Sequence, residues 1–268
     1  MPLFFSIKCF LEFSLFKIIF LLLFPLSNKL TSKIISNTFM FLGKISKYNQ
    51  IAKSNCRIVF PNLDEKEITK IIDSSWRNLG CNLHELTFLK KLVKSKDSIE
   101  IQGIEIIEEI KKEDSPVIFF SIHSGNWEIC VPVLDHHGFS IGAIYRHINN
   151  NFFDNYIYKK RTEAINTKNS FYTPKGKLSA KEILEGVINN KNIFLLVDQK
   201  DSAGTSIDFF GKKVKTQTGF LKIARKYNLK IVPMKNIRLP NNILQITFEQ
   251  PLMHNNKEIN DEKKMLEI

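Results

Sequence analysis

The chain has 268 residues, enough for one large domain or two small ones with a sizeable core, and it carries a net charge of +12 with a pI near 9.4. This excess of basic over acidic residues favours a polyanionic partner, which could be nucleic acid, anionic lipid headgroups or an acidic carrier protein. No glycine-rich nucleotide-binding motif and no Cys-x-x-Cys spacing occurs, which argues against a nucleotide cofactor and against a disulfide framework.

Residues 1–30 are predicted to form a hydrophobic membrane anchor. Their longest uninterrupted apolar run, residues 18–26, is too short to span a bilayer by itself, so the sequence leaves open whether the segment spans the membrane or lies in its interface. No acidic residue occurs between Glu12 and Asp64, and basic residues follow the apolar run, as is typical of the cytoplasmic side. A buried core helix is the alternative.

Residues 31–97 are predicted to be a helical region, with apolar residues at helical spacing from residue 64 to residue 92. Beyond residue 98, strands and helices alternate, which predicts an α/β core over residues 98–268 with a mostly parallel sheet covered by helices. Strands are expected at residues 98–102, 117–122, 140–145, 192–197, 230–234 and 243–248, and helices at residues 104–112, 127–134, 152–165, 179–189 and 219–227.

The strand expected at residues 117–122 runs into His-Ser-Gly-Asn-Trp-Glu, residues 123–128. Gly125 ends the strand and an apolar-periodic segment starts at Trp127, so His123 should stand in the loop at the strand's C-terminal end and Glu128 in the first helical turn. A carboxylate there could hold one ring nitrogen of His123, which would make the imidazole a general base for a hydroxyl or water. The alternative is a loop histidine satisfied by backbone, beside a glutamate that favours a helix N-terminus.

Two further strands are predicted to end in polar side chains at the same edge of the sheet. Arg146 should emerge beside His123, and its planar guanidinium suits a phosphate better than a lysine does, although it could be an ordinary surface arginine. Asp198 and Gln199 follow the strand at residues 192–197. We interpret Asp198 as binding an arginine of the site or orienting substrate, with a loop cap as the alternative.

The hexapeptide at residues 123–128 resembles the H-x4-D/E block of the lipid A biosynthesis acyltransferases, the late lauroyl and myristoyl transferases within the glycerolipid acyltransferase superfamily. The similarity extends over about residues 45–240, and several ordered blocks are more specific than one. The other similar blocks are Asn55 to Pro61, Leu79-Gly80 through Glu85, Tyr145-Arg146, Leu195 to Gln199, Phe209-Phe210-Gly211, Thr216, Ala224-Arg225 and Val232-Pro233.

The resemblance implies an enzyme that moves a fatty acyl chain from acyl-acyl carrier protein to a hydroxyl of a phosphorylated glycolipid, a lipid A precursor, at the cytoplasmic face of the bacterial inner membrane. It implies neither a cofactor nor a metal. His123 would take the hydroxyl proton, and Glu128 would fix its tautomer. The family generally continues to a tryptophan- and arginine-rich C-terminal block, whereas this chain ends in a charged segment at residues 256–267, so the C-terminus is expected to be truncated or that of a short variant.

The resemblance also assigns substrate-binding residues. Arg161 is the best match to a cleft arginine that stabilises charge on the reacting carbonyl, and Arg146, Asp198 and Gln199 would bind substrate. Phe209 and Phe210 would lie near the acyl pocket, with plain packing as an equal alternative.

Two alternative functions stay open at this point. One is an acyltransferase for another lipid acceptor, such as a glycerophospholipid or a glycolipid. The other is a basic, membrane-bound binding protein without catalysis. Nucleic acid is not expected as a partner, because no basic patch interleaved with exposed aromatics is recognisable.

Overall fold

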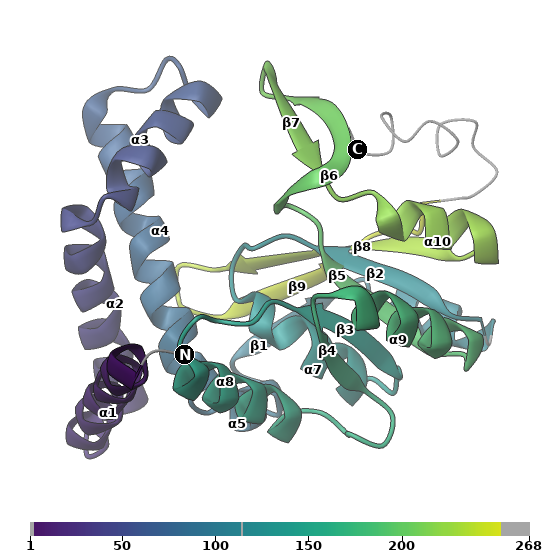
Figure 1. Ribbon diagram of the computed structural model, residues 1–268, viewed down its shortest axis with the longest axis horizontal. Coiled ribbons are helices and arrows are strands. Elements are labelled where there is room, and N and C mark those ends of the chain that lie inside the picture. Colours follow the sequence, from purple (N-terminus) through teal and green to yellow (C-terminus); the bar gives the residue numbers. More distant parts are fainter. Residues whose placement is uncertain (1–2, 114, 253–268) are drawn as a thin grey trace. The chain divides into compact units, whose positions relative to one another are not determined.

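The computed structural model describes residues 3–113 and 115–252 (Figure 1). The charged segment at residues 256–267 lies outside the described residues. The chain divides into two compact units, one of Met1–Leu89 with Ile148–Lys160, the other of Lys90–His147 with Arg161–Ile268. This division differs from the boundaries at residues 30 and 97 expected from the sequence, because residues 148–160 group with the N-terminal helices.

The first unit is helical. Asp64 starts its longest helix with a capping box, in which the Asp64 carboxylate accepts from the Glu67 N–H at 2.8 Å and the Glu67 carboxylate accepts from the Asp64 N–H at 3.0 Å. The buried Ile68 and Ile72 of this helix pack against Cys56. The helices are α1 (Leu3–Leu23), α2 (Asn28–Ile45), α3 (Tyr48–Val59), α4 (Glu65–Leu86) and, up to residue 160, α8 (Asn151–Glu163).

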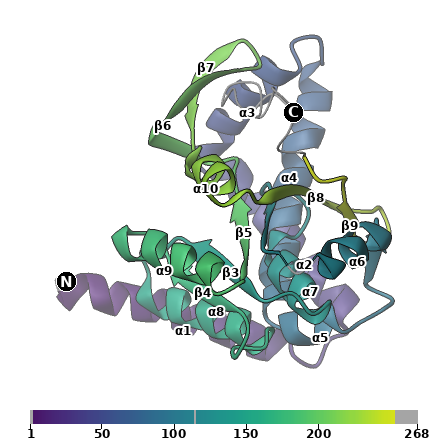
Figure 2. The same ribbon diagram turned by 90° about the vertical axis from the view of Figure 1, so that its right-hand side faces the viewer.

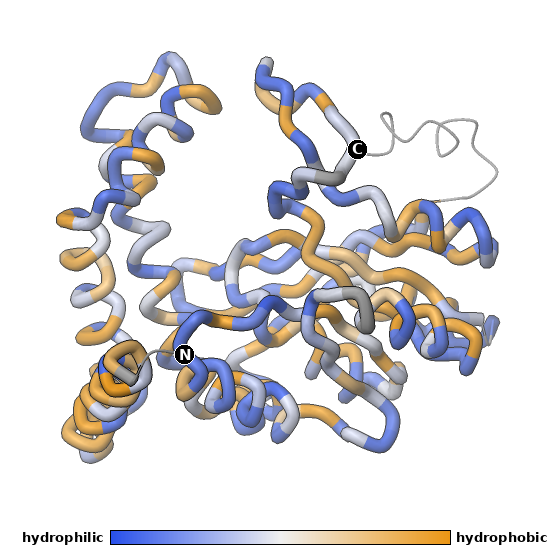
Figure 3. The backbone as a smooth tube through the Cα atoms, viewed as in Figure 1, coloured by the Kyte–Doolittle hydropathy of each residue, from blue (hydrophilic) through white to orange (hydrophobic). Residues whose placement is uncertain are grey.

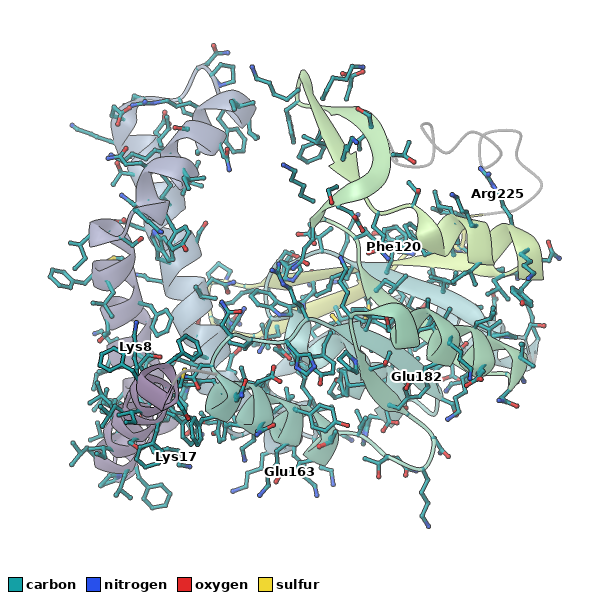
Figure 4. All side chains as sticks on the ribbon, viewed as in Figure 1. Lys8, Lys17, Phe120, Glu163, Glu182 and Arg225 are labelled. Atoms are coloured by element: carbon teal, nitrogen blue, oxygen red, sulfur yellow. The ribbon has the colours of Figure 1, made fainter. Side chains whose placement is uncertain are left out.

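Helix α1 packs its phenylalanines against α8 and leaves much of its apolar surface exposed. The Phe13 ring stacks on Phe152 at 6.1 Å and meets Phe153 edge-on at 5.3 Å. Apolar residues cover most of α1 in Figure 3, and Figure 4 shows Lys8 and Lys17 interrupting them. None of the helices in the described part of the chain combines the length and hydrophobicity that crossing a bilayer requires. A spanning anchor at residues 1–30 therefore has no support here.

The second unit is built on a seven-stranded sheet with the order β1-β9-β8-β2-β5-β3-β4. All neighbours are parallel except β8 and β9, which confirms the predicted α/β fold with a mostly parallel sheet. The strands are β1 (Ile99–Gln102), β2 (Val117–Ser121), β3 (Ile141–Tyr145), β4 (Phe171–Pro174), β5 (Asn192–Leu196), β8 (Lys230–Arg238) and β9 (Leu244–Phe248).

Helices cover both faces of this sheet, and the alternation of side chains along β2 connects the two layers. Ile118 belongs to the apolar cluster under α9 and α10, and Phe120, labelled in Figure 4, lies 6.3 Å from the Phe220 ring of α10. Phe119 points to the other face, 5.1 Å from the Phe139 ring. Figure 2 shows α9 and α10 on one face and α6 and α7 on the other. The helices are α5 (Leu89–Val93), α6 (Ile104–Lys112), α7 (Cys130–His136), α9 (Lys177–Ile188) and α10 (Gly219–Tyr227).

A separate two-stranded hairpin, β6 (Lys200–Phe209) with β7 (Lys212–Thr216), projects from the carboxyl edge of the sheet between β5 and α10 (Figures 1 and 2). Neither strand of this hairpin was predicted, and β4 was also missed. Since β2, β5, β3 and β4 are parallel neighbours, the residues that follow them gather at one edge, which is where open α/β sheets bind ligands.

Candidate active site

His123 and Asp198 meet at the carboxyl edge of the sheet because β2 and β5 are parallel neighbours. Ser121 pairs with Leu196, so the residues two positions further along each chain lie side by side. His123 Nδ1 lies 2.7 Å from Asp198 Oδ1, and the His123 backbone N–H donates to Asp198 Oδ2 at 3.0 Å. One carboxylate therefore fixes both the ring and the backbone of the histidine.

The charge on Asp198 determines which nitrogen of His123 is basic. Burial raises the pKa of the Asp198 carboxyl, but the hydrogen bonds from the His123 ring and backbone outweigh it, so the pKa is lowered overall. An ionised carboxylate can only accept, so a neutral imidazole carries its proton on Nδ1 and its lone pair on Nε2. The Gln199 amide nitrogen, 3.3 Å from Nε2, donates to that lone pair.

Glu128 does not hold the His123 ring, contrary to the expectation from the sequence. It lies in the short 3-10 turn η1 (Trp127–Ile129), as predicted for a first helical turn, but its carboxylate faces Arg161. Arg161 Nε and Nη2 donate to its two oxygens at 2.6 and 2.7 Å. The physical reason for the difference is that Asp198 on the neighbouring strand already occupies Nδ1, while a bidentate guanidinium engages both oxygens of Glu128.

The Glu128–Arg161 pair is largely buried, with 11% and 17% of the two side chains exposed. Burial raises the pKa of Glu128, but the charge and hydrogen bonds of Arg161 outweigh it and the pKa is lowered. Burial lowers the pKa of Arg161, and Glu128 raises it by more. The rings of Tyr145 and Tyr172 lie 5.7 and 5.9 Å from the guanidinium carbon, within cation–π range. Both side chains of the pair are therefore charged, and Glu128 and the two tyrosine rings restrain the Arg161 guanidinium.

Trp127 connects this ion pair to the histidine. Its indole Nε1 donates to Glu128 Oε1 at 3.1 Å, and its ring meets the His123 ring at a tilt of 60° and 5.1 Å between centroids. Glu128 is therefore linked to His123 indirectly. It accepts a hydrogen bond from the Trp127 indole, and the indole ring contacts the His123 ring.

Asn236 on β8 holds the loop that carries His123 in place through hydrogen bonds. This residue is fully buried, and the sequence did not identify it as part of the site. Asn236 Oδ1 accepts from the Asn126 N–H at 3.2 Å, and the Asn236 carbonyl accepts from the Ser124 hydroxyl at 2.6 Å. Gly125 has φ +50°, and a Cβ there would lie 2.5 Å from Asn236 Oδ1. Glycine is required here for both its backbone conformation and this close approach.

A cavity of about 620 Å³ opens at this edge of the sheet, and its polar end is formed by site residues predicted from the sequence. His123, Glu128, Arg146, Arg161 and Gln199 all line it. The rest of the wall combines polar residues, among them Lys175, Asp201 and Lys222, with apolar residues from the sheet, α9 and α10. These apolar residues include Ala143, Ile144, Ile183, Leu195, Phe220 and Ile223.

Phe209 and Phe210 are not among the residues that line this cavity. They lie at the turn of the β6–β7 hairpin, with 56% and 54% of each residue exposed. They therefore lie outside the cavity that His123 lines, and their expected place near the acyl pocket stays a prediction. Within residues 3–113 and 115–252, no group of three or more histidine, cysteine, aspartate or glutamate side chains gathers as a metal site would require.

We predict that Glu128→Gln destabilises the protein in a pH-dependent way. Since the pKa of Glu128 is lowered in the folded state, the ion pair contributes stability above the unfolded pKa of about 4.3, and this contribution is lost as the pH falls through the folded pKa. Breaking a buried pair costs about 3–5 kcal/mol. Urea unfolding should show this loss at pH 7, and the loss should decrease as the pH is lowered below about 4. Glu182→Gln, on the exposed face of α9, is the control; equal losses for both variants at pH 7 would contradict the prediction.

We predict that Asn236→Ala loosens the His123 loop. The substitution leaves the Asn126 N–H without its acceptor and opens a small cavity, which together should lower the free energy of unfolding by about 1–3 kcal/mol. Amide hydrogen exchange of residues 123–128 should accelerate more than that of β2. Unchanged exchange in this loop would show that Asn236 does not hold it.

The site geometry can be set beside known proteins. A model of the bacterial lipid A biosynthesis acyltransferase family matches residues 5–267, which include every residue of the candidate site. A comparison with curated proteins gives no match. The match spans nearly the whole chain and agrees with the blocks around His123, Asp198 and Gly211 that resemble this family. The chain therefore belongs to the bacterial lipid A biosynthesis acyltransferases.

Proposed function

We propose that this protein transfers a fatty acyl chain from acyl-acyl carrier protein to a hydroxyl of a phosphorylated glycolipid precursor of lipid A, with His123 as the general base. The observation that carries the proposal is the hydrogen bond between His123 Nδ1 and Asp198, which leaves the lone pair on Nε2 of a residue that lines a cavity with both polar and apolar walls. The family supports acyl transfer in lipid A biosynthesis, and the donor and acceptor are our inference from it.

The proposed step needs no covalent acyl-enzyme. The acceptor hydroxyl displaces the Gln199 amide from His123 Nε2 and gives its proton to that nitrogen. Its oxygen attacks the thioester carbonyl and forms a tetrahedral oxyanion. The oxyanion collapses to the ester as the carbon–sulfur bond breaks, and the departing thiolate takes the proton back from Nε2. Asp198 stabilises the imidazolium that exists between the two transfers.

Charge on the oxyanion requires donors that are fixed before the reaction. Arg161 lines the cavity and is held rigidly by Glu128, Tyr145 and Tyr172. A guanidinium has five N–H donors, and the bonds to Glu128 come from Nε and Nη2. We assign Arg161 to oxyanion stabilisation, together with the Gln199 amide once the hydroxyl has displaced it. Glu128 then positions Arg161 and the Trp127 indole.

Phosphates of the acceptor would bind further along the same edge. Arg146 follows β3 and Lys175 follows β4, and the Lys175 N–H donates to the Tyr145 carbonyl, so these two cations are neighbours. Both line the cavity. Adjacent strands lie about 4.8 Å apart, which puts the β3 and β4 ends roughly 10–15 Å from the β2 end that carries His123. This separation allows an acceptor to hold its phosphate at one end and its hydroxyl at the other.

We further propose that the protein works at the cytoplasmic face of the inner membrane, with α1 in the membrane interface. The exposed apolar surface of α1 supports this placement, since contiguous patches of this kind mark interaction sites. Its most exposed residues include Phe4, Leu21 and Leu22. The run of basic residues that follows α1 would face anionic headgroups.

We predict that Asp198→Asn abolishes most of the activity without unfolding the protein. An asparagine at this position would donate to Nδ1 and force the imidazole proton onto Nε2, which removes the base. Transfer in detergent from acyl-carrier donor to lipid A precursor should fall by roughly two to four decades, as for His123→Ala. Glu128→Gln should instead lower the thermal stability. If Asp198→Asn retained wild-type rates while Glu128→Gln abolished them at full stability, Glu128 would be the group that orients His123. Mass spectrometry of the product identifies the acceptor.

We predict that the apolar part of the cavity limits acyl length. Its volume of about 620 Å³ falls within the range of roughly 300–1,000 Å³ seen for small-molecule sites. Ile223→Phe fills part of it from the α10 side and should lower kcat/KM for the longest accepted donor by about ten-fold or more relative to shorter donors. Ile188→Phe, on exposed α9 surface outside the cavity, is the control. An unchanged preference in Ile223→Phe would place the acyl chain elsewhere.

A further inference from the structure

The tip of the β6–β7 hairpin carries two exposed phenylalanines that the proposed chemistry does not use. Phe209 pairs with Lys212 as the last rung of the hairpin, and Phe210 and Gly211 form a two-residue turn. The two phenylalanine rings contact each other edge-on at 4.6 Å. Neither ring lines the cavity at the sheet edge.

The turn that exposes these rings has a backbone conformation that is unfavourable for phenylalanine. Phe210 has φ +48° and Gly211 has φ +71°, the left-handed pair that a two-residue hairpin loop requires. Glycine adopts this conformation readily, whereas an aromatic residue does so rarely. Strain of this kind points to a functional reason for the residue, here a phenylalanine at the apex.

The hairpin that carries these rings is positively charged. Residues 200–216 contain four lysines and two aspartates. Lys213 Nζ lies 2.6 Å from Asp208 Oδ2, and Lys212 and Lys213 are both exposed beside the phenylalanine pair. Lysine stems can lie along apolar groups while their ammonium groups reach a layer of phosphates above them.

The small size of the hairpin tip favours a lipid bilayer over a protein as its partner. A specific protein interface needs about 800 Å² per partner with a complementary surface, which a two-residue turn cannot provide. An isolated two-stranded hairpin is also a poor rigid platform. An exposed apolar tip followed directly by two lysines fits the region between the headgroups and the acyl chains of an anionic bilayer.

We propose that the β6–β7 hairpin inserts Phe209 and Phe210 into an anionic lipid bilayer, with Lys212 and Lys213 at the headgroup phosphates. This contact is additional to any made by α1, and it does not rest on the acyl-transfer chemistry. Each lysine near an anionic surface strengthens binding by about five-fold.

The test places a tryptophan at the tip and asks whether lipid reaches it. Phe209→Trp, with Phe210→Trp as a second variant, is mixed with vesicles of brominated phosphatidylcholine and phosphatidylglycerol. The matched control is Ile188→Trp, which is 65% exposed at the C-terminal end of α9, on the opposite edge of the same sheet. Wild type supplies the background from Trp76 and Trp127. We expect the emission of the tip tryptophan to fall at least about two-fold more than that of the control, and only with anionic vesicles.

Charge neutralisation provides the second arm. In Phe209→Trp, adding Lys212→Gln and Lys213→Gln should raise the vesicle concentration for half-maximal quenching by about 25-fold. The proposal is overturned if the tip is quenched no more than the control in vesicle-bound protein. It is equally overturned if tip emission responds to an acidic acyl carrier protein and not to lipid. Either failure leaves the role of His123 untouched, because that role is measured by transfer in detergent.

Discussion

The parallel pairing of β2 with β5 is the constraint on which the site depends. It brings the residue after one strand beside the residue after the other, so a 2.7 Å contact joins His123 to Asp198 across 75 residues of sequence. The ladder hydrogen bonds of the two strands hold this geometry, and the hydrogen bonds from Asn236 hold the loop that follows β2. A one-residue slip of β5 against β2 would turn the side chains of β5 to the other face of the sheet and separate Asp198 from His123. The core of the second unit, packed on both faces of these strands, therefore fixes the orientation of the imidazole.

The two carboxylates near the histidine have separate tasks because their surroundings differ. Asp198 is partly exposed and bonds directly to the ring, where it determines which nitrogen is basic. Glu128 is nearly buried and neutralises Arg161, whose charge would otherwise be costly in this position. The H-x4-E spacing places Glu128 close to His123 in space, but closeness does not decide hydrogen bonding. A guanidinium that matches both oxygens outcompetes one imidazole nitrogen.

Sequence patterns predicted most of this architecture, and the failures have physical causes. Buried strands such as β2 and β5 are continuous apolar runs, and the 3.6-residue period of α6 and α10 is clear, so their ranges and the parallel sheet were found. The hairpin was missed because Lys200–Phe209 is polar and lacks regular alternation, as a solvated strand can be. The partner of His123 and the role of Asn236 could not be found, since each depends on a pairing register between distant segments that a single sequence does not contain.

The arrangement of charge around the cavity would suit the two amphiphilic substrates of the proposed reaction. His123, Arg146, Lys175 and Gln199 follow strand ends, and much of the apolar wall comes from the strands and from α9 and α10. An acyl chain buried in the apolar part would place its thioester carbonyl at the boundary where Nε2 of His123 lies. Arg146 and Lys175 line the same cavity as His123, so in the proposed reaction they would be available to the phosphates of the acceptor. If the proposed substrates bind here, this mixture of polar and apolar walls would orient each of them by its own polarity.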